Sequence, residues 1–159
     1  MQPAEALFEF RSIAGGLLVQ EPDAALPSLS HWRHAAGPAL PKSMERAAVL
    51  AVVAVKHLKS NAIAIAQGDM VLGAGCGCVD RVTACTVAIE KSAGRITPGN
   101  SVAASDAFFP FADGPEMLID AGVAAIIQPG GSKRDQDTID LCHERNVTLL
   151  ITDVRHFRH

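Results

Sequence analysis

The chain has 159 residues, of which 48% are hydrophobic and 19% are charged, a composition that supports a folded domain with a substantial core. Its formal net charge is −3, and it contains six Phe, one Trp and no Tyr. These values argue against a basic surface or an aromatic platform for nucleic acid. The apolar run at 47–55 is shorter than the roughly 20 residues of a membrane span. The N-terminal residues lack the basic segment and apolar run of a leader peptide, so we expect a cytoplasmic protein with no membrane contact.

The four cysteines, at positions 76, 78, 85 and 142, do not have the spacing of a zinc site. Cys76 and Cys78 form one C-x-C pair, and no second pair or HxxxH motif accompanies it. We expect four reduced thiols, either buried or in loops, in a reducing compartment.

The first third of the chain predicts a strand, a long loop and a buried helix. Gly15 and Gly16 predict a turn between an apolar lead-in at 1–10 and a strand at 17–19. Five Pro or Gly residues and weak periodicity at 21–42 predict a long surface excursion that contains Trp32. Ser43 is a candidate N-cap for a helix over 44–58, which is apolar on nearly every side.

A hairpin and a glycine-rich segment follow. The pattern predicts a strand at 61–66 that turns back into a strand at 70–72. Gly73, Gly75 and Gly77 then precede a predicted helix over 79–91. This order lets backbone N–H groups approach an anion. The alternative is a plain tight turn, because the spacing is not the dinucleotide-binding fingerprint.

The segment SDAFFPFAD at 105–113 holds three of the six Phe. A Pro between aromatic residues is unfavourable in a helix or a central strand, so we expect the strand at 102–107 to end in an irregular turn. This turn could present ring faces and two carboxylates to a flat, partly polar ligand. The alternative, favoured by composition alone, is a hydrophobic plug with a capping Asp.

The remaining segments predict alternating helices and strands. Asp113 is a candidate N-cap for a helix that ends at Gly122, and a strand follows at 123–128. Residues 129–132 (PGGS) then open a helix over 133–145, as a second candidate anion cradle, before a last strand at 148–152. This order predicts an α/β fold of three layers, α/β/α, with a mixed sheet in one domain over 1–159. Ligands of such folds bind beyond the carboxyl ends of the strands.

Several motifs occur together and in a fixed order, which makes their combination specific. They are FRSIAGGLLVQ (10–20), VKHLKSNAI (55–63), GAGCGCVDR (73–81), SDAFFPF (105–111), IQPGGSKRD (127–135) and RHFRH (155–159). Over essentially its whole length the chain resembles the C-terminal half of the transformylase region in the AICAR transformylase/IMP cyclohydrolase family. The resemblance implies a cytidine-deaminase-like fold without the deaminase zinc site, and a homodimer with active sites between subunits. It also implies formyl transfer from 10-formyltetrahydrofolate to AICAR in purine biosynthesis.

The resemblance also implies roles for individual residues. Asn61 matches the residue that meets the AICAR carboxamide and the formyl centre, as the candidate catalytic residue. Arg81 and Arg155 match arginines of the nucleotide site, with Arg155 at the phosphate. The block that lines the family's folate pocket is matched here by Phe108, Pro110, Phe111 and Asp113. Ser60, Asp106 and the C-terminal tail match a region that can hold a monovalent cation such as K⁺ through carbonyl oxygens.

This sequence departs from the family pattern at several points. Cys78 stands where the family usually has Gln, Asp80 where it has Ser, and Ala112 where it has Arg. The family's Lys-His catalytic pair belongs to the preceding half of the transformylase, and Lys56-His57 is a different site at a helix end. We therefore expect one half of a split enzyme whose partner chain carries the other half. The alternatives are a non-catalytic AICAR- or folate-binding module and a remnant that only oligomerises.

Overall fold

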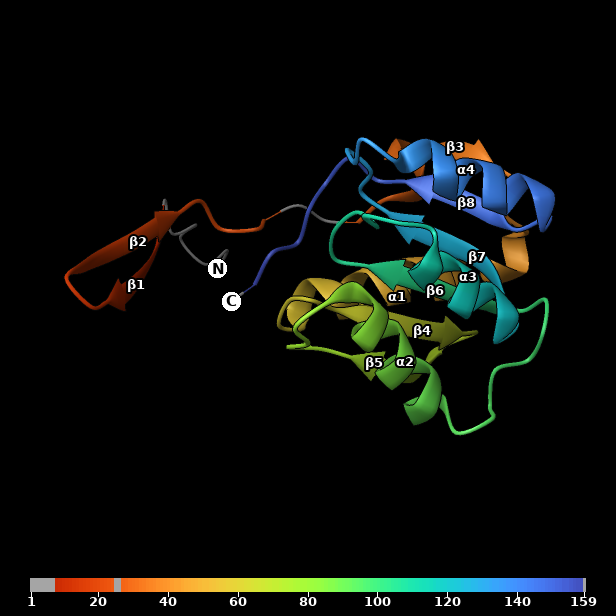
Figure 1. Ribbon diagram of the computed structural model, residues 1–159, viewed down its shortest axis with the longest axis horizontal. Helices are drawn as coiled ribbons and strands as arrows, with labels where there is room; N and C mark the ends of the chain where they lie inside the picture. Colours follow the sequence, from red (N-terminus) through yellow and green to blue (C-terminus); the bar gives the residue numbers. More distant parts are fainter. Residues whose placement is uncertain (1–7, 25–26, 159) are drawn as a thin grey trace, which may run out of the picture.

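The computed structural model describes residues 8–24 and 27–158, and Figure 1 shows how their helices and strands are arranged. The elements are β1 (Glu9–Ile13), β2 (Gly16–Gln20), η1 (Leu29–His31), β3 (Arg33–Ala36), η2 (Lys42–Met44), α1 (Glu45–His57), β4 (Ile63–Gln67), β5 (Met70–Gly75), α2 (Arg81–Ser92), β6 (Ser101–Ser105), α3 (Asp113–Asp120), β7 (Val123–Gln128), α4 (Asp135–Glu144) and β8 (Thr148–Ile151). None of the helices in these two stretches is both long and apolar enough to cross a bilayer.

The main sheet has six strands in the order β3-β8-β7-β6-β4-β5. Strands β6, β7 and β8 are parallel to their neighbours within this group, whereas β3, β4 and β5 pair antiparallel. The prediction of a mixed sheet is therefore confirmed. The parallel strands are joined by α3 and α4, since a parallel pair needs a crossover connection.

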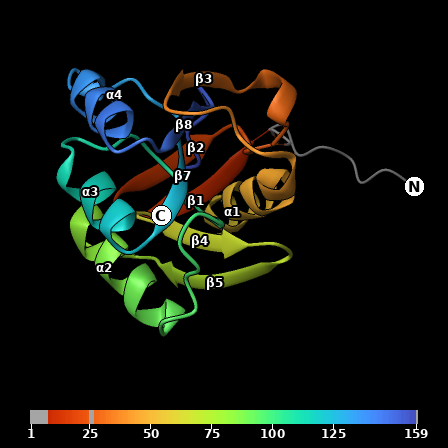
Figure 2. The same ribbon diagram turned by 90° about the vertical axis from the view of Figure 1, so that its right-hand side faces the viewer.

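Alternate residues of the central strands enter two separate cores. Ile63 and Ile65 of β4 face the core shared with α2, α3 and α4. Ala64 and Ala66 face the core of α1. Figure 2 shows α1 on one face of the sheet and the other three helices on the opposite face, which confirms the three layers. The likeness to cytidine deaminase in particular stays a prediction.

The structure corrects the prediction of a surface excursion across 21–42. Arg33–Ala36 form β3, which pairs with β8 at the edge of the main sheet, and Ala36 is fully buried. Gly37 follows with a φ of +70°, and a Cβ there would lie 1.9 Å from the Val147 carbonyl oxygen. The strand was missed because four residues of sequence RHAA show neither alternation nor β-branched side chains.

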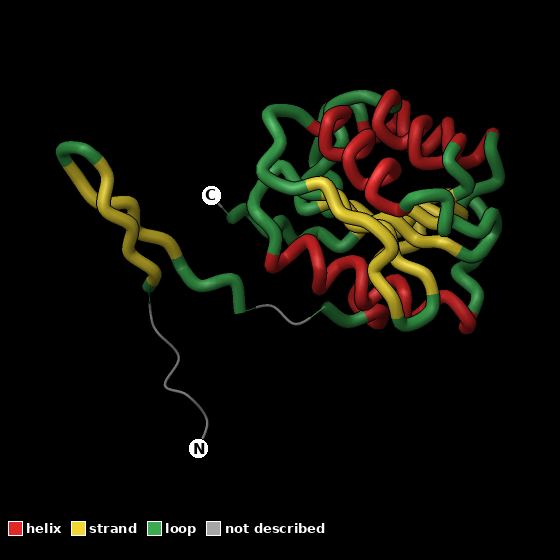
Figure 3. Tube along the Cα trace, turned by 90° about the horizontal axis from the view of Figure 1, so that it is seen from below, coloured by secondary structure: helices red, strands yellow, loops and turns green. Residues whose placement is uncertain are grey.

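The N-terminal segment forms a second, separate sheet. Strands β1 and β2 pair antiparallel around Gly15 and Gly16, and the hairpin extends away from the main sheet (Figures 1 and 3). The apolar lead-in expected at 1–10 includes the first two residues of β1, Glu9 and Phe10, and its residues 1–7 lie outside the described residues. The predicted strand at 17–19 is confirmed.

Two predicted helix caps are wrong. Ser43 lies in a 3-10 turn, and α1 begins after Met44 without a side-chain cap. Asp113 is the first residue of α3, after Ala112, and its Oδ1 accepts a hydrogen bond of 2.8 Å from the adjacent Gly114 N–H. In both cases the helix begins within one residue of the predicted position. The sequence pattern therefore predicted the helix more accurately than the capping residue.

Candidate functional site

Five chain segments meet at the carboxyl edge of the parallel strands. They are the residues that precede β4, the first turn of α2 and the residues that follow β6, β7 and β8. Backbone hydrogen bonds connect them: Asp106 N–H donates to Ala62 O at 3.2 Å, and His156 N–H donates to Asp106 O at 2.9 Å. Thr152 N–H donates to Gln128 O at 2.9 Å. This edge is where ligands of open α/β sheets are expected to bind.

A buried polar network connects three of the predicted site residues. The Arg81 guanidinium, 7% exposed, forms an ion pair with the fully buried Asp106. Its Nη2 donates to Asn61 Oδ1 at 3.0 Å, and Asn61 Nδ2 donates to Cys78 O at 3.0 Å. Asn61 follows a cis peptide bond at Ser60. Both polar atoms of its side-chain amide are hydrogen-bonded, so the orientation of the amide is fixed. Arg81 is itself buried, so it contacts Asn61 and Asp106 and presents little surface of its own.

The same network contains two unsatisfied polar atoms. Arg81 Nε and Asp106 Oδ2 are buried, and neither has a hydrogen-bond partner among the described residues. Buried polar atoms are normally paired. An unpaired carboxylate oxygen is the kind of atom that binds a hard cation.

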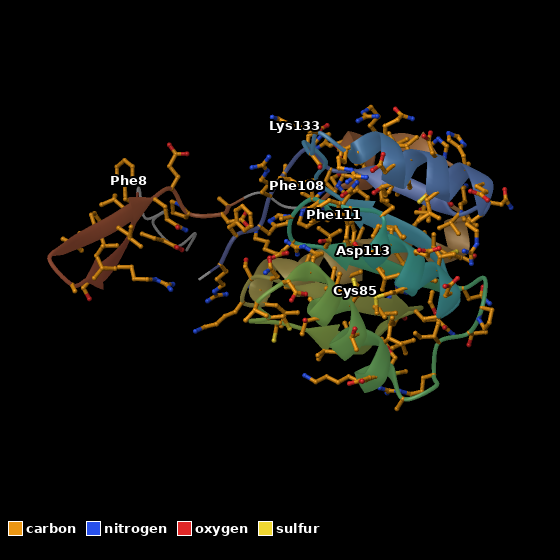
Figure 4. The ribbon with its side chains drawn as sticks, viewed as in Figure 1. Phe8, Cys85, Phe108, Phe111, Asp113 and Lys133 are labelled. Atoms are coloured by element: carbon orange, nitrogen blue, oxygen red, sulfur yellow. The ribbon has the colours of Figure 1, made fainter. Side chains whose placement is uncertain are left out.

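The aromatic turn after β6 divides into a buried and an exposed part. Phe109 is 1% exposed, and its N–H donates to the Oε1 of the buried Gln128 at 2.9 Å. Phe108 is half-buried, whereas Pro110 and Asp113 are exposed and Phe111 is 51% exposed. The hydrophobic-plug alternative therefore applies to Phe109, which anchors the turn. Figure 4 shows Phe108, Phe111 and Asp113 near one another at this edge.

Two guanidinium groups lie over the rings of Phe108 and Phe111. Arg155 Cζ is 5.2 Å from the centre of the Phe108 ring, and Arg134 Cζ is 4.9 Å from the centre of the Phe111 ring. Arg155 also lies close to the PGGS loop, since its Nη2 would be 3.0 Å from a Cβ on Gly131. Both cations are within the distance of a cation–π contact. The folate and phosphate residues predicted from sequence are therefore direct neighbours.

Both predicted glycine cradles are wrong in detail. Gly73 and Gly75 belong to β5, and a Cβ on them would lie 2.2 and 2.1 Å from carbonyl oxygens of α2. These two glycines therefore let the strand lie against the helix. In the PGGS loop, the N–H groups of Gly131 and Ser132 donate to Asp135 Oδ2 at 2.7 and 3.2 Å. A carboxylate of the chain itself already occupies that position.

The C-terminal tail returns along the start of β4. Ser60 N–H donates to Arg158 O at 2.8 Å, and Arg158 N–H donates to Ser60 Oγ at 3.1 Å. His156 is buried, with its Nδ1 2.6 Å from Asp23 Oδ2, and Lys56 Nζ is 3.6 Å from the other oxygen of that carboxylate. These contacts hold Arg155 at the site edge. His159 lies outside the described residues.

The structure gives a reason for two of the three departures from the family pattern. Asp80 is the N-cap of α2, and its Oδ1 accepts a 2.7 Å hydrogen bond from Thr83 N–H. That bond lowers the pKa of Asp80 below 3.8, and Ser caps helices equally well. Cys78 holds Asn61 through its backbone carbonyl, which any residue supplies. Ala112 offers no such explanation.

Sequence reasoning missed two residues of this edge. Arg134 contacts Phe111, and Gln128 holds the aromatic turn. A polar residue at the end of an otherwise apolar strand was a usable sequence signal for Gln128, whereas nothing in the sequence pairs Arg134 with Phe111. All four cysteines are free thiols. Burial raises the pKa of Cys85 and of Cys142 to about 12, so both are neutral near pH 7.

The fold and the arrangement of its edge define an α/β protein with a candidate ligand site at the carboxyl ends of its parallel strands. A sequence model of the AICARFT/IMPCHase bienzyme family matches residues 1–91, more than half of the chain. The chain belongs to this family.

Curated relatives agree over nearly the whole chain. The bifunctional purine biosynthesis protein PurH of Corynebacterium glutamicum (strain R) is 44% identical over 160 residues, which are 99% of this chain and 31% of that protein. The protein of the same name from Streptococcus mutans is 42% identical over 99% of this chain and 30% of its own length. That from Acetivibrio thermocellus is 43% identical over 96% and 29%. This chain therefore spans about a third of the length of these relatives.

Proposed function

We propose that this chain binds 10-formyltetrahydrofolate and AICAR, and contributes to formyl transfer between them in purine biosynthesis in the cytoplasm. The observation that carries the proposal is the carboxyl edge of the sheet. There the Arg155 guanidinium lies over the Phe108 ring, and Asn61 is held by hydrogen bonds to Arg81 and to the Cys78 carbonyl oxygen. The family membership and the names of the relatives support the same reaction.

Positioning is the main chemical contribution expected from Asn61. The amine of AICAR is a weak nucleophile because its lone pair is conjugated into the ring. Holding it against the formyl carbon and stabilising the tetrahedral oxyanion therefore matter most. The Asn61 amide would orient the carboxamide of AICAR, and the Arg81–Asp106 ion pair would keep Asn61 in place.

The folate would bind at the aromatic turn. Phe108 and Phe111 offer ring faces to the flat pterin, Pro110 adds apolar surface, and the Asp113 carboxylate accepts hydrogen bonds from ring N–H groups. Ala112 lacks the guanidinium that the family usually has there. Arg134, which contacts the Phe111 ring, would supply a cation at nearly the same place.

The phosphate of AICAR would bind at Arg155. This guanidinium lies beside Gly131 and offers the planar fork that suits a phosphate. A monovalent cation such as K⁺ fits the nearby Asp106, whose Oδ2 is buried without a partner in the described chain. The cation would neutralise charge next to Ser60 and the tail.

The proton-transfer step requires groups that residues 1–159 do not contain. The family's Lys-His pair lies in the preceding half, and Lys56 contacts Asp23 at the C-terminal end of α1. We propose that a partner chain supplies that half, within an assembly that is a homodimer or a complex of the two halves.

The test measures ligand binding and turnover separately. Titration calorimetry with AICAR and a folate analogue should show binding to the wild-type chain. Arg155→Ala should weaken AICAR binding roughly 10- to 100-fold, the value of a hydrogen-bonded charge pair. Phe111→Ala should weaken binding of the folate analogue several-fold. Val79→Ala, a change at a 91% exposed residue, is the control for surface truncation.

Formyl transfer is then assayed with the preceding half of the C. glutamicum relative added in excess. Turnover only in the mixture supports the split enzyme. Binding without turnover in any mixture supports the second candidate, a binding or regulatory module. Absence of binding to either ligand contradicts both.

A further inference from the structure

The connection between β5 and α2 contains two cysteines that solvent can reach. Cys76 follows the last residue of β5, and Cys78 lies three residues before the first residue of α2. Cys76 is exposed and Cys78 is half-buried, whereas Cys85 and Cys142 are buried. Because access controls the reactivity of a thiol, thiol chemistry in this chain is open at the pair of residues 76 and 78.

The backbone between the two cysteines bends them toward each other. Gly77 has a φ of +65°, and a Cβ built there would have no neighbouring heavy atom within 4 Å, so this glycine serves a turn and not close packing. The Cys78 Sγ lies 3.7 Å from the Cys76 carbonyl oxygen. Two α-carbons two residues apart are separated by at most about 7 Å. The bend at Gly77 shortens that separation toward the roughly 4.4–6.8 Å that a disulfide requires.

The backbone of the same connection is hydrogen-bonded to Asn61 and its neighbour. The Cys78 carbonyl oxygen accepts hydrogen bonds from Asn61 N–H at 3.3 Å and from Asn61 Nδ2 at 3.0 Å. Cys78 N–H donates to Asn61 O at 3.5 Å, and Gly77 N–H donates to Lys59 O at 2.7 Å. A change in the backbone at 77–78 therefore acts directly on Asn61.

We propose that Cys76 and Cys78 form a reversible redox modification site, which closes to a disulfide when glutathione disulfide accumulates and then releases Asn61. The Cys76 thiolate attacks one sulfur of glutathione disulfide, so a mixed disulfide forms at Cys76 and one glutathione thiolate leaves. The Cys78 thiolate then attacks the Cys76 sulfur, forms the protein disulfide and displaces the second glutathione. Each displaced glutathione takes up the proton of one protein thiol. Two protein thiols are thus oxidised, and one glutathione disulfide is reduced.

The disulfide loosens the contact between Cys78 and Asn61. It requires the two Cβ atoms to approach to about 3.8 Å, and because only Gly77 separates them, closing the ring rotates the peptide units on both sides of Gly77. The Cys78 carbonyl then turns away from Asn61. Exposed disulfides are the readily reduced ones, so the change is reversible. It does not depend on formyl transfer, and its test contains neither AICAR nor a folate.

The experiment incubates the full chain in buffers with a rising ratio of glutathione disulfide to glutathione, followed by acid quenching, alkylation of the unfolded chain and mass spectrometry. The wild type should lose two of its four alkylated thiols and retain no glutathione, and peptide mapping should place the disulfide at 76–78. Cys78→Ser lacks the second thiol and should retain one glutathione at Cys76. Cys142→Ala removes a buried thiol and is the matched control, which should form the disulfide like the wild type.

Amide hydrogen exchange followed by NMR tests the effect on Asn61. In the oxidised wild type the Asn61 amide should exchange roughly tenfold faster than in the reduced protein, the value of about one hydrogen bond. Cys78→Ser keeps the backbone carbonyl but cannot close the ring, so the same treatment should leave its Asn61 amide unchanged. The amide of the fully buried Ala103 in β6 reports global stability and should not respond. Reduction with dithiothreitol should restore the slow exchange of Asn61.

Three results would overturn the proposal. The first is a wild type that stays fully reduced at every glutathione ratio, which would mean that neither thiol is accessible in solution. The second is a wild type that accumulates bound glutathione without closing the ring, since the two thiols would then not meet. The third is a disulfide at 76–78 that leaves the exchange of the Asn61 amide unchanged, because the pair would then have no effect on the site.

Discussion

At the scale of single residues, the Arg81–Asp106 pair is the most consequential interaction of the site edge. Arg81→Met leaves the buried Asp106 carboxylate without its partner. Breaking a buried ion pair on one side costs about 3–5 kcal/mol, so we expect a loss of that size in the free energy of unfolding, measured with urea. The same change at Arg145, whose pair with Asp120 is solvent-exposed, should cost under about 1 kcal/mol.

The double variant Arg81→Met with Asp106→Asn distinguishes charge from packing. Removing both charges should recover a large part of the stability lost in the single variant, because no unpaired ion remains. If the double variant is as unstable as the sum of the two single variants, the side chains contribute through packing and not through their charges.

The lowered pKa of Asp80 predicts a specific dependence of stability on pH. The Thr83 N–H lowers the pKa of Asp80 below its ordinary value of 3.8. The cap therefore contributes fully above that value and is lost as the pH falls through the lower pKa of the folded state. Asp80→Ser keeps a cap that does not titrate. Between pH 6 and about pH 2.5, the melting temperature of the wild type should fall further than that of Asp80→Ser.

The two melting curves are compared at each pH, since the other carboxyl groups titrate equally in both proteins. A constant difference between them from pH 6 to pH 2.5 would mean that the Asp80 carboxylate adds nothing beyond the hydrogen bond of a neutral cap. At the same time, the comparison tests whether the family's usual Ser at this position is a structural equivalent of Asp80.

At the scale of secondary structure, the contact between β5 and α2 depends on glycine. A Cβ on Gly75 would lie 2.1 Å from the Ala84 carbonyl oxygen, which belongs to the backbone of α2 and cannot rotate away. Gly75→Ala should therefore destabilise the protein by at least the roughly 1–3 kcal/mol typical of overpacking. Gly16→Ala is the control, because the nearest atom to its Cβ is 3.9 Å away. Urea unfolding of both variants decides whether close packing, and not loop flexibility, explains this glycine.

The elements differ in how much of them the sequence reveals. The prediction of β7 at 123–128 agrees with the structure at both ends, because VAAIIQ is apolar and bounded by Gly122 and Pro129. β3 gave no signal, since an edge strand of four residues is stabilised by pairing with β8 and not by its own pattern. Gly73 and Gly75 show a different limit: a glycine that permits close packing looks the same in sequence as one in a ligand loop.

The site shows the same limit between local and distant contacts. The motif SDAFFPF predicts an irregular aromatic turn, and the turn is present. Which ring is buried depends on Gln128, 19 residues away, whose Oε1 accepts the Phe109 N–H. The contact of Arg134 with Phe111 likewise joins separate segments. The properties of a single motif can be predicted from its sequence, whereas contacts between distant motifs become known only from the three-dimensional structure.

At the scale of the whole molecule, the described chain consists of a main sheet covered by helices and an exposed hairpin, and their stabilities should differ. Every residue of β6 and β8 is buried, and the two strands lie on either side of β7 in the centre of the sheet. The hairpin has exposed residues throughout both strands. Strands without packed neighbours open locally at low free energy.

Hydrogen–deuterium exchange should make this difference in local stability visible. In dilute solution the amides of β1 and β2 should exchange within seconds, because an isolated hairpin is barely stable, while those of β6 and β7 remain protected. Protection of the hairpin amides comparable to that of β6 and β7 would contradict this expectation, because it would mean that both strands of the hairpin are packed against another surface.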